Sequence, residues 1–177
     1  SNFDGDILFE YDSMEDFSDF VNKVRMEAII RESTLQSEEI QVFGEAFPDF
    51  RTFSLSGSAE GTINDLKAEN IDLKVGSTTE LKGSLALKNT TYTDSLFIDA
   101  SQIDFHTIPK DVRFMYALFS DTALPIEIEP LGAVSLHGDF KGYLDDFITE
   151  ARINTELGNV RADLKLKNPG NENSITY

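Results

Sequence analysis

One pattern of residues occurs twice along this chain, and this repetition limits the possible folds more than any other feature. Leu-x-Gly-x-x-x-Gly-x-x-x-Asp-Leu begins at Leu55, and the same spacing begins again at Leu136, with Phe in the last place. Further along, Leu-Ala-Leu-Lys-Asn from Leu85 is matched by Leu-Lys-Leu-Lys-Asn from Leu164. Repeats that keep their order predict similar structural units packed side by side. The matched residues of the longer pattern are Gly57 and Gly138, Gly61 and Gly142, and Asp65 and Asp146.

Apolar and polar residues alternate within each copy. The first copy places Leu55, Gly57 and Ala59 at one parity, and two serines, a glutamate and a threonine at the other. A period of two residues is typical of an antiparallel sheet that has one face in water. We therefore expect a mainly β protein with two similar sheet blocks, near residues 51–89 and 132–168.

Two further local patterns refine this expectation. Gly76-Ser77 and Gly158-Asn159 are predicted to form the hairpin turns between the second and third strands of the two blocks. Between the blocks, the apolar parity changes from Ala100 to Ile103, which predicts a β-bulge or a bend.

Short helical patterns lie between the strands. Ser13 and Ser37 are predicted helix N-caps, and Pro109 suits the first turn of a third helix. The expected unit is a strand, a short amphipathic helix and three antiparallel strands, over residues 24–89 for unit one and 95–168 for unit two. The apolar residues at helical spacing are Met14, Phe17, Phe20, Val21 and Val24; Ile40, Phe43 and Phe47; and Val112, Met115, Tyr116 and Phe119.

The charge balance excludes some classes of function. The 177 residues hold 15 Lys and Arg against 32 Asp and Glu, a net charge of −17, so the chain repels phosphate backbones and nucleic-acid binding is not expected. Hydrophobic residues make up 40%, which is enough to build a core. There is no cysteine, which excludes disulfides, thiolate nucleophiles and sulfur-ligated metals. No apolar run has the length of a membrane span.

The sequence gives no support for catalysis. The two histidines have no partner nearby in sequence; His137 has the polar parity of a solvated strand residue, and His106 is predicted to be a loop or capping residue. The acidic pairs Asp16/Asp19 and Asp145/Asp146 fit a helix start and a turn better than a calcium loop. Neither a nucleophile elbow nor a phosphate loop is present. We expect no enzyme activity, no catalytic residue, no cofactor and no bound metal.

The repeated Gly/Asp-Leu pattern, followed by Val75-Gly76 and Leu85-x-Leu87, resembles the repeats of the TamB family. This is the translocation and assembly module subunit, part of the wider AsmA-like group, and the pattern is most similar to its Bacteroidetes branch. The resemblance covers both units, from Val24 to Asn168. It implies an elongated, curved antiparallel β-repeat, folded like a taco around a hydrophobic groove.

The resemblance also implies a function and a location. Members of the family are anchored in the inner membrane, span the periplasm, and serve in lipid transport to the outer membrane or in outer-membrane protein assembly. A phospholipid or other acyl-chain ligand is then the expected partner, with an Omp85-type barrel bound through a region outside this chain. Residues 1–177 are accordingly expected to be one fragment of a longer periplasmic repeat protein.

The apolar parity of the strands supplies the candidates for the groove. The alternative is a closed β-sandwich in which the same residues pack as a core, in a structural, adhesive or carbohydrate-binding envelope domain. A missing Trp weighs against sugar binding, and alternation alone does not separate groove from core. The candidate groove residues are Leu55, Ala59, Ile71, Leu73, Val75, Leu85, Leu87, Leu136, Phe140, Ile153, Leu157, Leu164 and Leu166.

Overall fold

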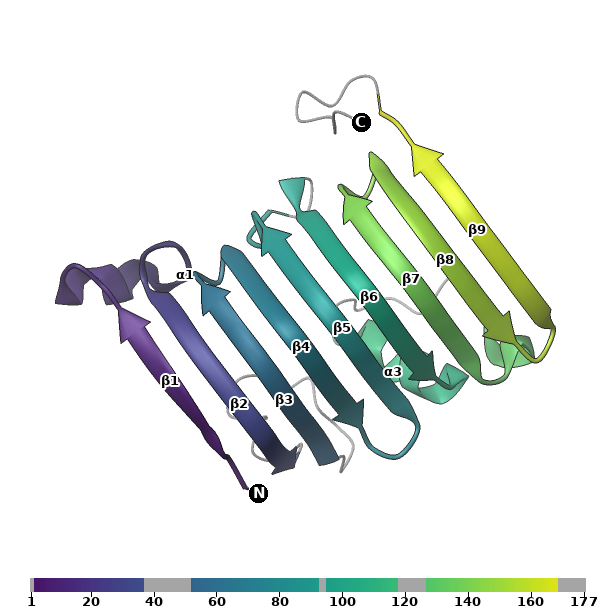
Figure 1. Ribbon diagram of the computed structural model, residues 1–177, viewed down its shortest axis with the longest axis horizontal. Helices are drawn as coiled ribbons and strands as arrows, with labels where there is room; N and C mark the ends of the chain where they lie inside the picture. The colour runs from purple at the N-terminus through teal and green to yellow at the C-terminus, as the bar shows by residue number, and fades with distance from the viewer. Residues whose placement is uncertain (1, 37–51, 93–94, 118–126, 169–177) are drawn as a thin grey trace.

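The described strands of this protein form one antiparallel sheet, in which each strand pairs with its neighbours in sequence (Figure 1). The computed structural model describes residues 2–36, 52–92, 95–117 and 127–168. The expected mainly β fold is confirmed, as a nine-stranded sheet with a few short helices. The strands are β1 (Gly5–Glu10), β2 (Arg25–Gln36), β3 (Thr52–Gly61), β4 (Asp65–Val75), β5 (Thr79–Lys88), β6 (Phe97–Thr107), β7 (Val134–Gly142), β8 (Phe147–Thr155) and β9 (Gly158–Leu166).

The strand register divides the side chains between an apolar face and a polar face. Partners in an antiparallel ladder point to the same side of the sheet, so rows of paired residues can be followed from strand to strand. One row runs from Leu55 on β3 through Leu73, Leu81, Phe105, Leu136 and Ile153 to Val160 on β9. We call the side that carries this row the apolar face. The opposite side, the polar face, carries Glu27, Glu60, Lys67, Lys82, Asp104, Lys141 and Arg161.

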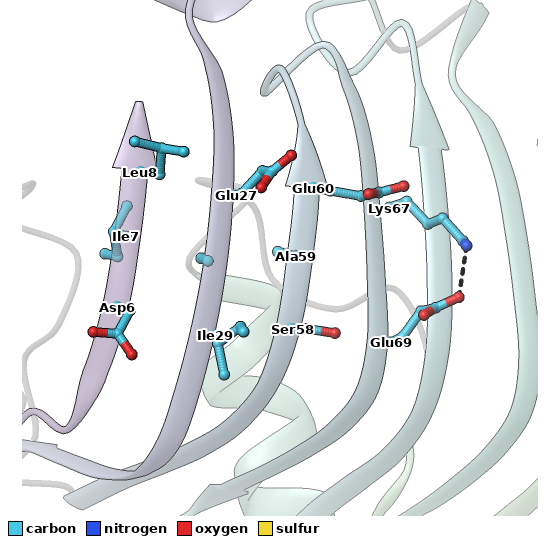
Figure 2. Close-up of a pocket in the computed structure, with 11 residues that line it drawn as sticks. Asp6, Ile7, Leu8, Glu27, Ile29, Ser58, Ala59, Glu60, Lys67 and Glu69 are labelled. Atoms are coloured by element: carbon cyan, nitrogen blue, oxygen red, sulfur yellow. Dashed lines mark ion pairs between the residues drawn. The ribbon is translucent and has the colours of Figure 1, made fainter. Parts of the chain in front are cut away.

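β-Bulges interrupt the register along one line across the sheet. The register shifts after Ile30 on β2, after Ala68 on β4 and after Ala100 on β6, so the predicted irregularity between Ala100 and Ile103 is confirmed. Asn70 and Gln102, inside two of these bulges, have left-handed φ values of 53° and 54°. A bulge bends its strand, so aligned bulges curve the whole sheet along this line. The bent strands are visible in Figure 2.

Few residues of the sheet are fully buried. Among the described residues, the buried hydrophobic side chains are Val24, Ala28, Val75, Ala100 and Ile128. All the described strands belong to one sheet, so no second sheet covers the apolar face within these residues. Most residues of that face are half-buried by their neighbours in the same layer. The closed sandwich considered above is therefore not what the described residues form by themselves.

Short helices lie at the ends of the strands. The helix predicted at Ser13 is present but is split into a 3₁₀ turn, η1 (Met14–Asp19), and a single α turn, α1 (Phe20–Lys23); Ser13 and Asp16 form a capping box at its start. The helix predicted at Pro109 is confirmed as α3 (Pro109–Ala117), and η4 (Glu129–Leu131) leads into β7. The helix predicted from Ser37 lies outside the described residues.

Two local predictions need correction. Gly76-Ser77 does form the β4–β5 turn, but Gly158-Asn159 belongs to β9, and the β8–β9 turn consists of Glu156 and Leu157. His106 lies in β6 and not in a loop, because β6 stays paired with β7 as far as Thr107. The sequence also gave no prediction for β1, which pairs with β2 at one end of the sheet.

Candidate functional site: the apolar face of the sheet

The candidate groove residues lie on the apolar face, with one exception. Twelve of them occupy strand positions whose register partners are also apolar-face residues. Leu157 is the exception, because it lies in the β8–β9 turn, where its side chain is 71% exposed. The alternation of apolar and polar residues ends there, because the two-residue turn changes which residues point to the apolar face. The residues on the face are Leu55, Ala59, Ile71, Leu73, Val75, Leu85, Leu87, Leu136, Phe140, Ile153, Leu164 and Leu166.

Repeated glycines of the two copies occupy equivalent places on this face. Gly57 lies opposite Ile30, and Gly138 lies opposite Ile103, in the line of the bulges. Gly61 and Gly142 lie in a second row, near the other end of the strands, and both are buried. The exact bounds of the two units stay a prediction.

Helix α3 closes one end of the apolar face. Asp111, in its first turn, is 2% exposed and accepts hydrogen bonds from the hydroxyls of Thr78 (2.5 Å) and Thr79 (2.8 Å). The Thr79 and Thr107 hydroxyls are in turn 2.8 Å apart, and both residues are buried. A buried carboxylate is stable only where such donors surround it. This cluster therefore fixes α3 against the ends of β5 and β6.

Aromatic side chains line the opposite end and the β8 side. Phe9 on β1 contacts Phe20 of α1 with a ring-centroid distance of 5.7 Å, edge to face. Phe140 and Phe147, on neighbouring strands, lie 5.0 Å apart in a tilted stack. Each such pair adds a specific contact to the area that it buries. The apolar face thus has a helix at one end of its strands and aromatic rings towards the other.

The apolar face is long enough for an acyl chain. Neighbouring strands are spaced by about 4.8 Å, so nine strands extend over roughly 38 Å. One leaflet's share of a bilayer hydrocarbon core is roughly 15 Å. Exposure rises towards the edge strand β9, where Val160 is 59% and Leu164 is 50% exposed. An exposed apolar surface that runs across many strands is typical of a site that binds an apolar partner.

The polar face carries a different kind of surface. A shallow hollow of about 400 Å³ lies over β1–β4, among Asp6, Glu27, Glu60 and Lys67, whose ion pair with Glu69 has an N–O distance of 2.6 Å (Figure 2). A second, of about 570 Å³, lies over β6–β9. About half of the residues that line each hollow are charged, and Leu8, Ile29 and Ile148 add apolar side chains. No groove residue was predicted for this side.

Ion pairs within and between strands cover the polar face. Lys82 contacts Glu80 at 2.8 Å and Asp72 at 3.5 Å, and Lys141 contacts Asp99 at 2.6 Å. The hydrogen bond from Lys82 lowers the pKa of Glu80, and the charges of Lys82 and Lys74 add to this effect. Such exposed pairs organise a solvated surface and contribute little stability each. They give no arrangement of an acid beside a base that is typical of a catalytic site.

The described residues contain no helix that is long and apolar enough to cross a membrane. In the same residues, no three His, Cys, Asp or Glu side chains lie close enough together to hold a metal ion. His137 is an exposed residue of β7, as predicted, and the Nδ1 atom of His106 lies 2.8 Å from the Ser135 hydroxyl. The expectation that the protein is not an enzyme stays a prediction.

Comparison with known proteins found no matching family model, no matching curated protein and no matching solved structure. The resemblance to the TamB family therefore stays an interpretation of the sequence pattern.

Sequence reasoning missed the Asp111 cluster. The only local signal was an acidic residue in the turn after Pro109, which is an ordinary feature of a helix start. Its partners Thr79 and Thr107 lie on two other elements, and only the register of β5 and β6 brings them together.

Proposed function

We propose that this chain is a segment of a conduit that carries acyl chains along the apolar face of its sheet, in transport of lipid to the outer membrane or in assembly of outer-membrane proteins. The observation that carries the proposal is the continuous apolar face of a one-layer sheet, which no second sheet covers within the described residues. The expected setting is the periplasm, in a longer protein that is anchored in the inner membrane and works with an Omp85-type barrel.

The physical argument rests on the cost of moving a lipid through water. Each methylene exposed to water costs about 0.8 kcal/mol, so a lipid in transit needs an apolar surface along its whole path. A face of Leu, Ile, Val and Phe supplies this surface without directional contacts, which suits a ligand that has to slide. The charged polar face keeps the other side of the sheet in water.

The proposal can be tested with a phospholipid that carries a photoreactive acyl chain. After irradiation of the purified protein with this lipid, we expect the label on apolar-face residues of β4–β8. Phe140→Arg places a charge among these residues and should reduce labelling at least fivefold, since an unpaired charge beside an acyl chain costs several kcal/mol. Circular dichroism should show that the variant keeps its sheet.

A matched control lies on the next strand. Ile148 on β8 pairs with Lys141 and therefore lies on the polar face. Ile148→Arg makes the same chemical change as Phe140→Arg on the opposite side and should leave labelling unchanged. Equal loss of labelling in both variants, or labels confined to the polar face, would contradict the proposal. Unfolding of Phe140→Arg alone would favour a closed core, with a second layer from another copy.

A further inference from the structure

A continuous trough runs across the strands on the polar face. The hollow over β1–β4 shares Lys67 and Glu69 with a third hollow, of about 250 Å³, over β4–β6. That hollow in turn shares Asp99 and Ser101 with the hollow over β6–β9. The three hollows therefore join end to end over the nine described strands, a span of roughly 38 Å at about 4.8 Å per strand.

The strand register explains how the trough forms. Its floor is the backbone of one transverse row, in which Ala28 pairs with Ala59 and Ala59 pairs with Ala68, and the side chains of this row point to the apolar face. The residues before and after each floor residue point to the polar face and form the two walls. In the middle of the trough these walls include the small side chains of Ser84 and Ala86, which leave it open between the two larger hollows.

The lining of the trough is acidic. The residues around the three hollows include eight Asp and Glu against three Lys, which gives a net charge of −5. Two of the lysines are already paired within the trough, Lys67 with Glu69 and Lys141 with Asp99, each at 2.6 Å. The charge that a partner meets along the trough is therefore negative.

Like charges lie side by side along each wall. Glu27 is directly opposite Glu60, and Glu150 is directly opposite Asp139. Arg25 reaches Glu60 at 3.9 Å, but within the described part of the chain neither Glu27 nor Glu150 forms an ion pair. Like charges in directly opposite positions destabilise a sheet. A cationic group bound in the trough would relieve this repulsion.

Apolar side chains at one end of the trough set a second requirement. Leu8 and Ile29 lie on the polar face, where their register partners are Glu27 and Asp6 (Figure 2). They are 54% and 57% exposed among charged neighbours. Exposed apolar side chains that gather in a hollow are typical of a surface that binds a partner. A partner that fits this end therefore carries apolar groups as well as positive charge.

We propose that the trough binds an extended, basic segment of another polypeptide, with Lys or Arg along its length and apolar residues over Leu8 and Ile29. An extended chain advances about 3.4 Å per residue, so roughly eleven residues span the trough. Its positive charges complement the acidic walls, and such complementarity selects a basic chain over an acidic one. A nucleic acid has the wrong sign of charge for this surface. The trough lies on the side of the sheet opposite the apolar face, so the proposal does not depend on the proposed acyl-chain function.

The test uses a fluorescent peptide of eleven residues in which Lys alternates with Ser and the last two residues are Leu. It is titrated onto the whole chain and followed by anisotropy. We expect saturable binding that weakens with salt, and no binding by the same peptide with Glu in place of Lys. Glu27→Lys combined with Glu150→Lys should weaken binding roughly tenfold, because two attractive contacts become repulsive. The control Glu32→Lys combined with Glu156→Lys makes the same change in charge at exposed residues outside the three hollows and should bind like the wild type.

A second variant distinguishes binding in the trough from general attraction to an acidic protein. Ile29→Ser should weaken binding of the peptide that ends in Leu about fivefold, since apolar contact is lost, and should leave binding of a peptide with Ser in place of the two Leu unchanged. If the Glu27→Lys/Glu150→Lys protein does not fold by circular dichroism, Glu27→Gln/Glu150→Gln replaces it, with a smaller expected loss. Absence of saturable binding, equal binding to all variants, or displacement of the peptide by calcium ions at constant ionic strength would overturn the proposal.

Discussion

Gly83 on β5 and Ile103 on β6 share one space on the apolar face, which the isoleucine fills and the glycine leaves open. A Cβ atom on Gly83 would lie 2.7 Å from Cδ1 of Ile103 and 3.0 Å from the carbonyl oxygen of Ser101. Gly83 also has a φ of 143°, a conformation that other residues rarely adopt. At Gly57, in the same line of bulges, a Cβ atom would lie 3.0 Å from the carbonyl oxygen of Glu69 and 3.2 Å from Cα of Ile71. Glycines in this line thus allow the neighbouring backbone to come close, and Gly83 also leaves room for Ile103.

Gly83→Ala should destabilise the protein by about 2–3 kcal/mol, since it combines backbone strain with overpacking. Urea denaturation measures the loss. Ile103→Val removes the Cδ1 methyl, so in the Gly83→Ala background it should recover part of the loss rather than add to it. Gly76→Ala is the control for strain alone: Gly76 has a φ of 62° with nothing within 4 Å of its Cβ position, and about 1 kcal/mol is expected. If the losses of unfolding free energy from Gly83→Ala and Ile103→Val simply add in the double variant, this account is contradicted.

Asp111→Ala should loosen helix α3 from the end of the sheet. The change removes the acceptor of the Thr78 and Thr79 hydroxyls, and Thr79 is buried. A lost hydrogen bond to a buried charged group costs about 1.5–3 kcal/mol. We expect a loss of this size in urea denaturation, together with faster amide exchange in α3 and in the ends of β5 and β6. Lys110→Ala, an exposed neighbour on the same helix, should change neither measurement.

Arg31→Gln should weaken the attachment of β1 to β2. The guanidinium of Arg31 contacts Asp4 at 2.9 Å and Asp6 at 2.8 Å, and the hydrogen bond to Asp4 raises the pKa of Arg31. Without this charge, two carboxylates at the edge strand lose their counterion. Amide exchange in β1 should become faster while exchange in β4–β8 stays unchanged. The wild type should show part of the same effect at high salt, because these pairs are exposed to solvent.

Glu80→Gln should change the dependence of stability on pH. The hydrogen bond from Lys82 lowers the pKa of Glu80 below its ordinary value of 4.5, so the carboxylate stabilises the fold at neutral pH. This contribution is lost as the pH falls through the lowered pKa, because both states are then protonated. The variant should therefore unfold at lower urea than the wild type at pH 7, and the difference should shrink below pH 4.5. An equal difference between the variant and the wild type at pH 7 and below pH 4.5 would rule out this role of Glu80.

Leu73→Asp tests whether the apolar face is open. Leu73 is half-buried in the middle of β4, between Leu55 and Leu81. In a one-layer sheet the new carboxylate reaches water, so we expect the chain to stay folded with a loss of about 1–2 kcal/mol. In a closed core, the same charge would cost more than 4 kcal/mol and unfold the protein. Ser58→Arg, on the polar face, should have little effect in thermal denaturation followed by circular dichroism.

The sequence was informative wherever a short stretch of chain carries the physical cause. Alternation assigned Leu55, Leu73 and Leu136 to one face because successive strand residues point to opposite sides. The change of parity between Ala100 and Ile103 revealed a bulge, since the extra residue of a bulge shifts the alternation. Pro109 marked the start of α3, because its ring fixes φ and its missing N–H needs no partner in the first turn. At Leu157 the same reasoning failed, because a turn interrupts the period without changing the residue types around it.

Alternation by itself therefore determined which residues of a strand point to the same face of the sheet, and the repeat predicted two similar groups of strands. Only the tertiary structure decided what lies against each face: in the described residues the nine strands form one layer, and a helix held by Asp111 lies at one end of it. The physical reason is that parity is a local property of the backbone, whereas burial depends on elements that are distant in sequence. A leucine beside open solvent and a leucine beneath a second sheet have the same pattern around them, and only the packing of the whole chain separates the two.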